Sequence, residues 1–217
     1  MKTLLATLLL AFSTLALADR TDIHAAAEDV QPLLPGMTAP AFELRTADDQ
    51  PFPFDPAGME RPVVVTFFRG GWCPYCNLHL SEMRHAEARL KELGFDVWFV
   101  SMDRPGVLVE SLDEPDIGYT LLSDSRLGAT RGFGIAFRVE DATVERYKGF
   151  GVDLEEASGE DHHVLPAPAT FIIGQDGVIN FAYVNPSYDV RLAPSVLLAA
   201  AEAYREGADR RLKRNRG

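Results

Sequence analysis

The feature that most constrains this chain is a stretch from Val63 to Leu93, in which an apolar strand, a glycine turn and an amphipathic helix follow one another. Its first six residues are apolar or β-branched, which is typical of a strand buried on both faces in a sheet covered by helices. Gly70 and Gly71 end this strand. Apolar residues then recur at near-helical spacing, at Leu78, Leu80, Met83, Ala86 and Leu90. The stretch therefore predicts an α/β fold with this strand at its centre.

The only two cysteines, Cys73 and Cys76, lie at the junction of the predicted strand and helix. Pro74 fits the first turn of a helix, where its missing N–H group costs nothing. Unpaired backbone N–H groups and the positive end of the helix dipole stabilise a thiolate at a helix N-terminus. Because this effect is largest at Cys73, we expect Cys73 to attack and Cys76 to resolve the product as a disulfide.

Two other roles of such a cysteine pair fit this sequence less well. A structural disulfide between Cys73 and Cys76 would close a very small loop, so it would restrict the unfolded chain little and stabilise the fold little. A structural zinc site would need a second pair of cysteines, which the chain lacks. The pair is therefore predicted to be redox-active.

Length and charge narrow the class of protein. A chain of 217 residues is long enough for one domain with a sizeable core. Its apolar fraction of 47% and charged fraction of 24% are ordinary for a soluble globular protein. The net charge of −11 argues against nucleic-acid binding, which requires a basic surface.

Residues Met1 to Ala18 have the pattern of a secretory signal peptide. Lys2 forms a short basic region, Leu4 to Leu17 an apolar core, and the last three residues an A-x-A cleavage site before Asp19. An uncleaved anchor is the alternative, but the apolar run is short for a membrane span. We therefore expect a periplasmic or secreted mature protein with no membrane span, whose dithiol meets an oxidising environment and needs a dedicated electron donor.

The remainder of the chain predicts further strands and helices around the central strand. Strands are expected at Ala41–Arg45, Phe95–Ser101, Tyr119–Leu122, Gly134–Val139, Pro166–Ile173 and Val178–Val184. Helices are expected within Asp19–Leu34 and at Pro105–Leu112, Ser125–Gly132, Asp141–Phe150 and Pro194–Tyr204. The turn at Asp176 and Gly177 predicts an antiparallel hairpin. The order strand, helix, strand around the cysteines predicts parallel pairing.

We expect a signal peptide at 1–18, an N-terminal arm at 19–34, one domain at 35–207 and a basic tail at 208–217. His24 in the arm is expected to be a solvated surface histidine. Gly151 to Leu165 is acidic and polar, so we expect a surface loop there, with a short helical turn at most. His162 and His163 in this loop could join the cysteines around a metal. Adjacent histidines in an acidic loop are more often exposed, so we expect no metal.

The order of these motifs resembles the thioredoxin fold. More narrowly, it is similar to the peroxiredoxin-like branch of the alkyl hydroperoxide reductase and thiol-specific antioxidant family. The resemblance covers nearly all of the chain after residue 35, in PGMTAPAFEL, FFRGGWCPYCNLHLSEM, SDSRLGATRGFGIAF and LPAPATFIIGQDGVINFAYVNPSYDVRLAP. It implies an α/β fold in which helices flank both faces of a central mixed β-sheet. It also implies an antioxidant oxidoreductase whose chemistry is carried by cysteine sulfur, with no cofactor.

Specific residues carry this resemblance. Cys73 matches the peroxidatic cysteine of peroxiredoxins and the first cysteine of thioredoxins, whereas Cys76 matches the second thioredoxin cysteine. Pro168 matches the thioredoxin cis-proline, and a cis bond would let the preceding Ala167 offer backbone hydrogen bonds to a substrate. An ordinary edge-strand proline is the alternative. The resemblance thus implies a substrate site formed beside the sulfur, from Thr66, Trp72, Pro74, Tyr75, Ala167 and Pro168.

The chain departs from the peroxiredoxin pattern at three places. Thr66 and Gly70 stand where those proteins carry a proline and a threonine before the attacking cysteine. The arginine that they place shortly before the strand at Phe171 is also missing. Arg69 could supply the missing guanidinium, lowering the thiol pKa and polarising a peroxide. It could equally be a solvated charge on the loop.

Two functions follow from the resemblance. The first is a thiol peroxidase, in which Cys73 becomes a sulfenic acid that condenses with Cys76. The second is a thiol–disulfide oxidoreductase that acts on protein disulfides. Both need a thiol electron donor, either a thioredoxin-like protein or a membrane reductase. A metal chaperone that uses the cysteines and a histidine is a third, weaker alternative.

Overall fold

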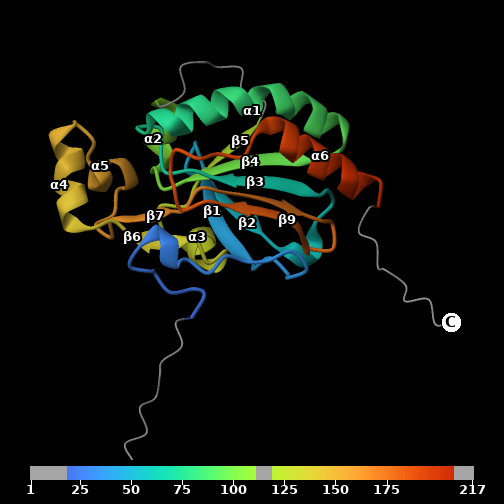
Figure 1. Ribbon diagram of the computed structural model, residues 1–217, viewed down its shortest axis with the longest axis horizontal. Coiled ribbons are helices and arrows are strands. Elements are labelled where there is room, and N and C mark those ends of the chain that lie inside the picture. The colour runs from blue at the N-terminus through green and yellow to red at the C-terminus, as the bar shows by residue number, and fades with distance from the viewer. Residues whose placement is uncertain (1–18, 111–118, 208–217) are drawn as a thin grey trace, which may run out of the picture.

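The computed structural model describes residues 19–110 and 119–207, which form one mixed α/β domain (Figure 1). The predicted signal peptide and basic tail lie outside these residues. The main sheet has seven strands in the order β2-β1-β5-β4-β3-β8-β9, and β6 and β7 form a separate pair. The strands are β1 (Phe42–Thr46), β2 (Pro51–Phe54), β3 (Val63–Phe67), β4 (Asp96–Ser101), β5 (Thr120–Ser123), β6 (Ala136–Arg138), β7 (Val164–Pro166), β8 (Ala169–Ile173) and β9 (Ile179–Val184).

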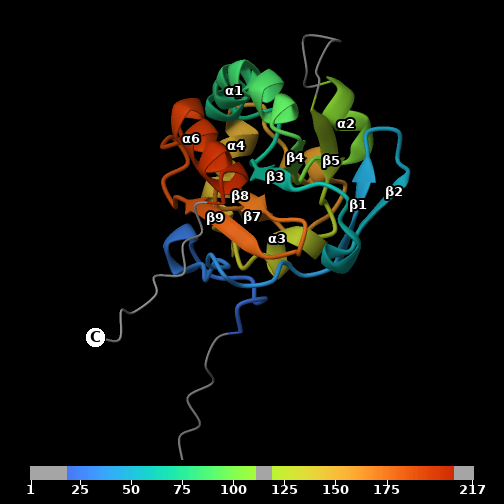
Figure 2. The same ribbon diagram turned by 90° about the vertical axis from the view of Figure 1, so that its right-hand side faces the viewer.

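Helices cover both faces of the main sheet. Figure 2 shows α1 and α6 side by side over one face and α3 below the other. The helices are α1 (Pro74–Glu92), α2 (Pro105–Glu110), α3 (Gly128–Gly132), α4 (Asp141–Gly149), α5 (Leu154–Ser158) and α6 (Pro194–Arg205), with 3-10 turns η1 (Ala27–Asp29) and η2 (Pro56–Gly58). The predicted α/β class, with helices on both faces of a central mixed sheet, is confirmed.

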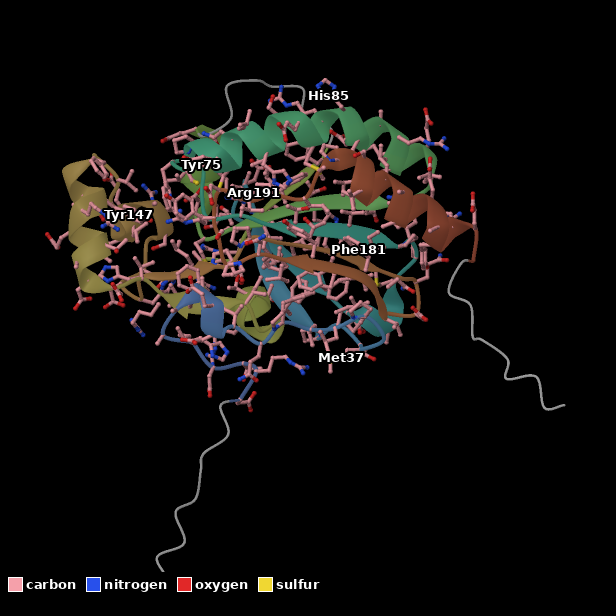
Figure 3. The ribbon with its side chains drawn as sticks, in the orientation of Figure 1. Met37, Tyr75, His85, Tyr147, Phe181 and Arg191 are labelled. Atoms are coloured by element: carbon pink, nitrogen blue, oxygen red, sulfur yellow. The ribbon has the colours of Figure 1, made fainter. Side chains whose placement is uncertain are left out.

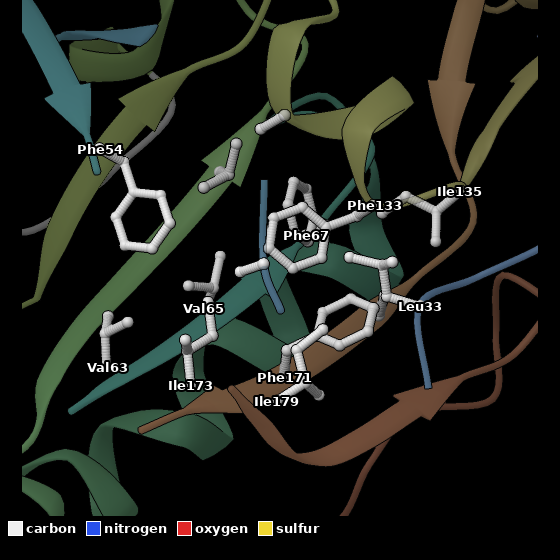
Figure 4. Close-up of a cluster of buried hydrophobic side chains, with 14 of the residues drawn as sticks. Leu33, Phe54, Val63, Val65, Phe67, Phe133, Ile135, Phe171, Ile173 and Ile179 are labelled. Carbon is white, nitrogen blue, oxygen red and sulfur yellow. The ribbon is translucent and has the colours of Figure 1, made fainter. Parts of the chain in front are cut away.

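Strand β3 is the centre of the sheet, as its composition predicts. All five of its residues are buried, and it pairs parallel with β4 and antiparallel with β8. Successive side chains of a strand point to opposite faces. Val63, Val65 and Phe67 accordingly join a cluster with Phe171 and Phe133 (Figure 4), whereas Val64 packs on the side of α1. This double burial fixes the end of β3, from which the cysteine turn leaves.

Helix α1 buries most of its predicted apolar face. Leu80, Met83, Ala86 and Leu90 are at most 4% exposed. Leu78 is 60% exposed, because it lies two residues before Leu80 and two residues turn a helix by about 200°. The β8–β9 hairpin also forms as predicted, with Gly177 at a positive φ of 72°.

The N-terminal arm does not form the predicted helix, apart from the single turn η1. It runs along β6 instead: His24 donates its N–H to the carbonyl of Ala136, and Arg138 donates to the carbonyl of His24. Because this pairing draws the residue into the fold, His24 is buried rather than solvated. The prediction of a surface histidine was therefore wrong.

Two other segments differ from expectation in their bounds. Helix α3 begins at Gly128 rather than Ser125, because Leu127 takes a left-handed conformation at its N-cap. The predicted surface loop at 151–165 contains α5 and β7, and Asp153 caps α5 by accepting two backbone N–H bonds. The predicted end of the helix at Leu112 lies outside the described residues. Within those residues no helix is long and apolar enough to cross a membrane.

Candidate active site

Cys73 is the N-cap residue of α1, so its sulfur lies at the positive end of the helix dipole. Its carbonyl accepts the N–H groups of Cys76 at 2.9 Å and Asn77 at 3.1 Å, which fixes the turn. Both thiols are free, with Cys73 2% exposed and Cys76 fully buried. The two cysteines therefore form a buried dithiol rather than one on an open surface.

The two thiols have opposite pKa shifts. A hydrogen bond from the Cys76 thiol, opposed by burial, lowers the pKa of Cys73 to about 6, and the positive charges of Arg69 and Arg191 contribute in the same direction. Burial, and then the neighbouring Cys73, raise the pKa of Cys76 well above its usual value. At neutral pH Cys73 is therefore the thiolate, and Cys76 is the protonated partner that hydrogen-bonds to it.

Arg69 is buried between aromatic rings at the end of β3. Its guanidinium carbon lies 5.1 Å from the ring centre of Trp72, 5.4 Å from that of Tyr147 and 4.7 Å from that of Tyr188. It also donates a short hydrogen bond to the Tyr147 hydroxyl. Such cation–π contacts strengthen when they are desolvated. Arg69 is only 5% exposed, so the alternative of a solvated loop charge was wrong.

The turn has no room for the threonine that peroxiredoxins carry at position 70. A Cβ on Gly70 would lie 2.7 Å from Asp103 Oδ1 and would clash with the Trp72 ring. Asp103, at the end of β4, accepts the Gly71 N–H at 2.7 Å and so braces the turn. Burial raises the pKa of Asp103 to about 6. The space that a threonine side chain would occupy at position 70 is thus filled by Trp72 and Asp103.

Three other residues of the predicted substrate site, Thr66, Pro74 and Tyr75, differ in how far they are exposed. Thr66 is buried, and its hydroxyl is hydrogen-bonded to that of Thr170 on β8 at 3.1 Å. Pro74 is the first residue of α1. The Tyr75 side chain is 45% exposed, and its ring packs edge-on against Tyr188 at 5.5 Å. Pro74 and Tyr75 are exposed, whereas Thr66 is closed off from a large partner.

Pro168 is not a cis-proline, because the described residues contain no cis peptide bond. The expectation of a thioredoxin-like cis-proline was wrong. Both neighbouring backbone groups are already used: Ala167 donates its N–H to Ile135, and Asn185 donates to the carbonyl of Pro168. The Ala167 N–H is therefore not free for the hydrogen bond to a substrate that a cis bond would have offered.

A cavity of about 240 Å³ is lined by Arg69, and neither cysteine is among its lining residues. Its walls include Pro168, Tyr147, Tyr188 and residues 25–28 of the N-terminal arm. Figure 3 labels Tyr147 on α4, and it labels Tyr75 at the start of α1 near Arg191. Arg69 also lines this cavity, so a substrate bound there would contact the residue that lowers the pKa of Cys73.

Sequence reasoning missed four residues of this site: Asp103, Tyr147, Tyr188 and Arg191. Asp103 could have been found, because it directly follows a strand parallel to β3, and polar groups at adjacent carboxyl ends meet at one edge. Tyr147 lies on α4, which the sequence predicts, and Tyr188 and Arg191 follow β9, but nothing local to these three residues links them to the cysteines. Arg191 donates from Nη2 to the Cys76 sulfur at 3.3 Å.

The histidines of the acidic loop do not join the cysteines. His162 Nε2 bonds to the Ser125 carbonyl, and His163 pairs with Glu155 at 2.8 Å. Both histidines are half-buried rather than exposed. Among residues 19–110 and 119–207, no group of three His, Cys, Asp or Glu side chains could hold a metal ion.

Comparison with known proteins decides the family. The model of the AhpC/TSA family matches residues 35–182, which include the cysteine turn, β3 and most of the β8–β9 hairpin. The chain belongs to the AhpC/TSA family. It is a peroxiredoxin-like, thiol-dependent oxidoreductase with a thioredoxin-type fold.

Individual relatives agree with this family. The chain is 29% identical over 106 residues to peroxiredoxin Bcp of Escherichia coli, spanning 49% of this chain and 67% of the relative. Its fold is similar to that of peroxidoxin BcpB of Mycobacterium tuberculosis, with a TM-score of 0.59 and 20% sequence identity. The match covers 78% of this chain and 96% of the BcpB chain. The fold is also similar to AhpC of Enterococcus faecalis, with a TM-score of 0.57 and 18% sequence identity. That match covers 85% of this chain and 96% of the AhpC chain. At these identities the solved structures show the fold alone.

Proposed function

We propose that this protein is an exported thiol peroxidase that reduces a peroxide at Cys73 and forms a disulfide with Cys76. The observation that carries the proposal is the Cys73 thiol, whose pKa is about 6 at the N-terminus of α1, in a chain of the AhpC/TSA family. A thiolate is the nucleophilic form of cysteine. The site therefore holds its attacking group ready at neutral pH.

The proposed reaction has three steps. The Cys73 thiolate attacks one peroxide oxygen; the O–O bond breaks, and the second oxygen leaves as an alkoxide or hydroxide that takes up a proton. Cys76 then attacks the resulting sulfenic acid, which releases water and forms the Cys73–Cys76 disulfide. A donor dithiol reduces this disulfide by exchange. Arg69 is the group that would stabilise charge on the leaving oxygen, as an electrostatic catalyst does.

A second candidate is a thiol–disulfide oxidoreductase that acts on protein disulfides. The intact Cys-x-x-Cys pair, in which the Cys76 thiol hydrogen-bonds to Cys73, favours it. The occupied backbone N–H of Ala167 and the 2% exposure of Cys73 count against it, since a protein disulfide must reach the sulfur.

Stopped-flow tryptophan fluorescence separates the two candidates, because Trp72 lies beside the thiols. Reduced protein would be mixed with hydrogen peroxide or with a disulfide peptide. The proposal requires the peroxide reaction to be much faster, and a faster peptide reaction would overturn it. Cys73→Ser should abolish both reactions. Cys76→Ser should allow one attack and accumulate a sulfenic acid that a dimedone probe detects.

Export is proposed from the sequence of residues 1–18 and is tested separately. Mass spectrometry of the protein recovered from a secreting bacterial host should give a chain that begins at Asp19 in the periplasmic or secreted fraction. A chain that keeps Met1 in the cytoplasm would contradict export and leave the peroxidase proposal standing.

A further inference from the structure

The segment at 186–192, which follows β9, crosses the cysteine site and is held there by three side-chain contacts. Tyr188 lies on the guanidinium of Arg69 at 4.7 Å. Arg191 donates to the Cys76 sulfur at 3.3 Å. The carbonyl of Leu192 is hydrogen-bonded to Nε2 of His79, one turn after Cys76 on α1. The segment therefore fixes Arg191 against the second cysteine.

Arg191 is oriented by a hydrogen bond to the backbone of its own segment. Its Nε donates to the Tyr188 carbonyl at 2.8 Å, which leaves the two terminal nitrogens to face the site. Nη2 contacts Cys76, and Nη1 is buried without a hydrogen-bond partner. Within the part of the chain that the structure describes, Arg191 forms no ion pair with a carboxylate. The sulfur is thus the partner of an otherwise unneutralised guanidinium.

The site contains two guanidinium groups that contact different parts of it. Arg69 is enclosed by Trp72, Tyr147 and Tyr188 and faces the cavity, whereas Arg191 bonds to the buried Cys76. We propose that Arg191 is the catalytic residue of the resolving step, holding Cys76 and stabilising its thiolate while it attacks the Cys73 sulfenic acid. This inference rests on the proposed function, because it assigns a second step to the same site.

The charges around Cys76 explain why Arg191 would act mainly in that step. In the dithiol form, burial, the hydrogen bond to Cys73 and the charge of Cys73 all raise the pKa of Cys76, whereas Arg191 lowers it. Once Cys73 becomes a neutral sulfenic acid, the effect of its charge is removed and that of Arg191 remains. Cys76 can then lose its proton and attack.

Other ionisable groups lie close to Arg191 or to Cys76 and do not replace the Arg191 guanidinium. Burial, and then Arg191 itself, lower the pKa of His79, so this histidine is neutral at pH 7. Asp103, whose pKa is about 6, is negative at pH 7 and opposes a second anion. Arg69 contributes a backbone N–H toward Cys76, but its guanidinium is engaged by the rings.

The resolving step is balanced within the protein. The Cys76 thiolate attacks the Cys73 sulfur, an S–S bond forms and the S–O bond breaks. The oxygen leaves as hydroxide and takes up a proton to become water. The peroxide has already supplied the oxidising equivalents in the first step, so no further oxidant is needed.

The test compares Arg191→Met and Arg191→Lys with wild type in rapid mixing with hydrogen peroxide. The first fluorescence phase should scale with peroxide concentration, and the second, disulfide formation, should not. We expect Arg191→Met to slow the second phase about tenfold and the first less than threefold, since a pKa change of one unit is a tenfold change in thiolate. Arg191→Lys, which keeps the charge, should restore part of the second rate.

Arg205→Met is the matched control, because Arg205 is exposed at the far end of α6. It should leave both phases unchanged. Equal slowing of both phases in Arg191→Met, or an unchanged second phase, would overturn the assignment. Circular dichroism of each variant checks that it is folded, and Arg191→Lys serves if the methionine variant is not.

A second measurement does not depend on peroxide. In a Cys73→Ser background, Cys76 is the only thiol, and its thiolate can be titrated by absorbance at 240 nm with and without Arg191→Met. Loss of the guanidinium should move the titration to higher pH, and no movement would overturn the inference. If wild type showed no peroxide phase but this shift appeared, the peroxidase proposal would fail and the link between Arg191 and Cys76 would stand.

Discussion

At the scale of single residues, burial and nearby charges set the pKa values of the groups in the site. Burial raises the pKa of Asp103 to about 6, as desolvation does for an acid. Burial acts in the same direction on Cys73, yet its pKa is lowered to about 6, because a thiol hydrogen bond and two guanidiniums favour the anion. The balance of these effects makes one sulfur a thiolate and leaves its neighbour protonated.

This balance predicts the pH dependence of peroxide reduction. Only the thiolate reacts, so the second-order rate of reduced protein with hydrogen peroxide should rise through about pH 6 and be level by pH 8. An ordinary cysteine, with a pKa of about 8.5, would still be gaining rate there. Stopped-flow rates from pH 5 to 9 measure the midpoint. A midpoint above pH 8 would contradict the lowered pKa of Cys73.

Arg69 predicts a difference between substrates. A guanidinium near the thiolate at an effective dielectric near 20 contributes on the order of 1 to 4 kcal/mol. A peroxidase also needs that charge for the leaving oxygen. Arg69→Met should therefore slow peroxide reduction about tenfold more than it slows reduction of a disulfide peptide.

Arg69→Lys controls for charge alone, because lysine lacks the planar group that stacks on the rings. It should fall between wild type and Arg69→Met in peroxide reduction. Equal and small losses with both substrates in Arg69→Met would show that Arg69 only packs the site.

At the scale of elements, the sequence predicts those whose cause is local. A β-branched run gives β3, Pro74 after Cys73 starts α1, and the turn at Asp176 and Gly177 closes the β8–β9 hairpin. The path of the arm and of residues 186–192 could not be predicted in this way. His24 pairs with β6, and Arg191 bonds to Cys76 across 115 residues, so distant partners fix both segments. The backbone of Ala167 and Pro168 is likewise hydrogen-bonded to partners outside its own segment, Ile135 and Asn185.

Asp124 gives a prediction for one element. The residue follows β5, is fully buried, and accepts the N–H groups of Ala129 at 3.1 Å and Thr130 at 2.6 Å in the first turn of α3. Asp124→Ala leaves these donors unpaired and should lower the free energy of unfolding by about 1 to 3 kcal/mol. Urea unfolding at pH 7 measures the loss.

Asp124→Asn is the matched control, because its amide oxygen can still accept one bond. Burial raises the pKa of Asp124 to about 6, so at pH 7 the wild-type carboxylate carries a desolvation cost that asparagine lacks. Asparagine should therefore destabilise less than alanine. If both variants lost the same free energy, the side chain would not be acting as a cap.

At the scale of the whole molecule, segments far apart in the sequence close one site at the end of β3. Residues 25–28 of the arm line the cavity, α4 supplies Tyr147, and the segment at 186–192 places Arg191 against Cys76. Cleavage after Ala18 would leave residues 25–28 in place, so the proposed export would keep this wall intact. The enclosed thiolate also links the redox chemistry to the stability of the entire fold, because its lowered pKa exists only in the folded chain.

That link predicts how the stability of the reduced protein changes with pH. The pKa of Cys73 is about 6 when folded and about 8.5 when unfolded, so the stabilisation is complete above pH 8.5 and is lost as pH falls through 6. The integrated effect is on the order of 3 kcal/mol. Asp103 and Asp124, with raised pKa values of about 6, act oppositely: stability falls as pH rises from about 4 to 6. To a first approximation, Cys73→Ser keeps both aspartates, so their contribution cancels in a comparison.

Urea unfolding of reduced wild type and Cys73→Ser, at pH 5.5 and pH 9, isolates the thiolate. The difference in unfolding free energy between the two proteins should grow by about 2 to 3 kcal/mol in favour of wild type at the higher pH. The oxidised wild type, whose disulfide carries no thiolate, should lose this pH dependence. A stabilised dithiol also makes the disulfide a stronger oxidant, so a donor would reduce it readily and the proposed cycle would close. A difference that stayed constant between the two pH values would show that the fold does not hold Cys73 as a thiolate.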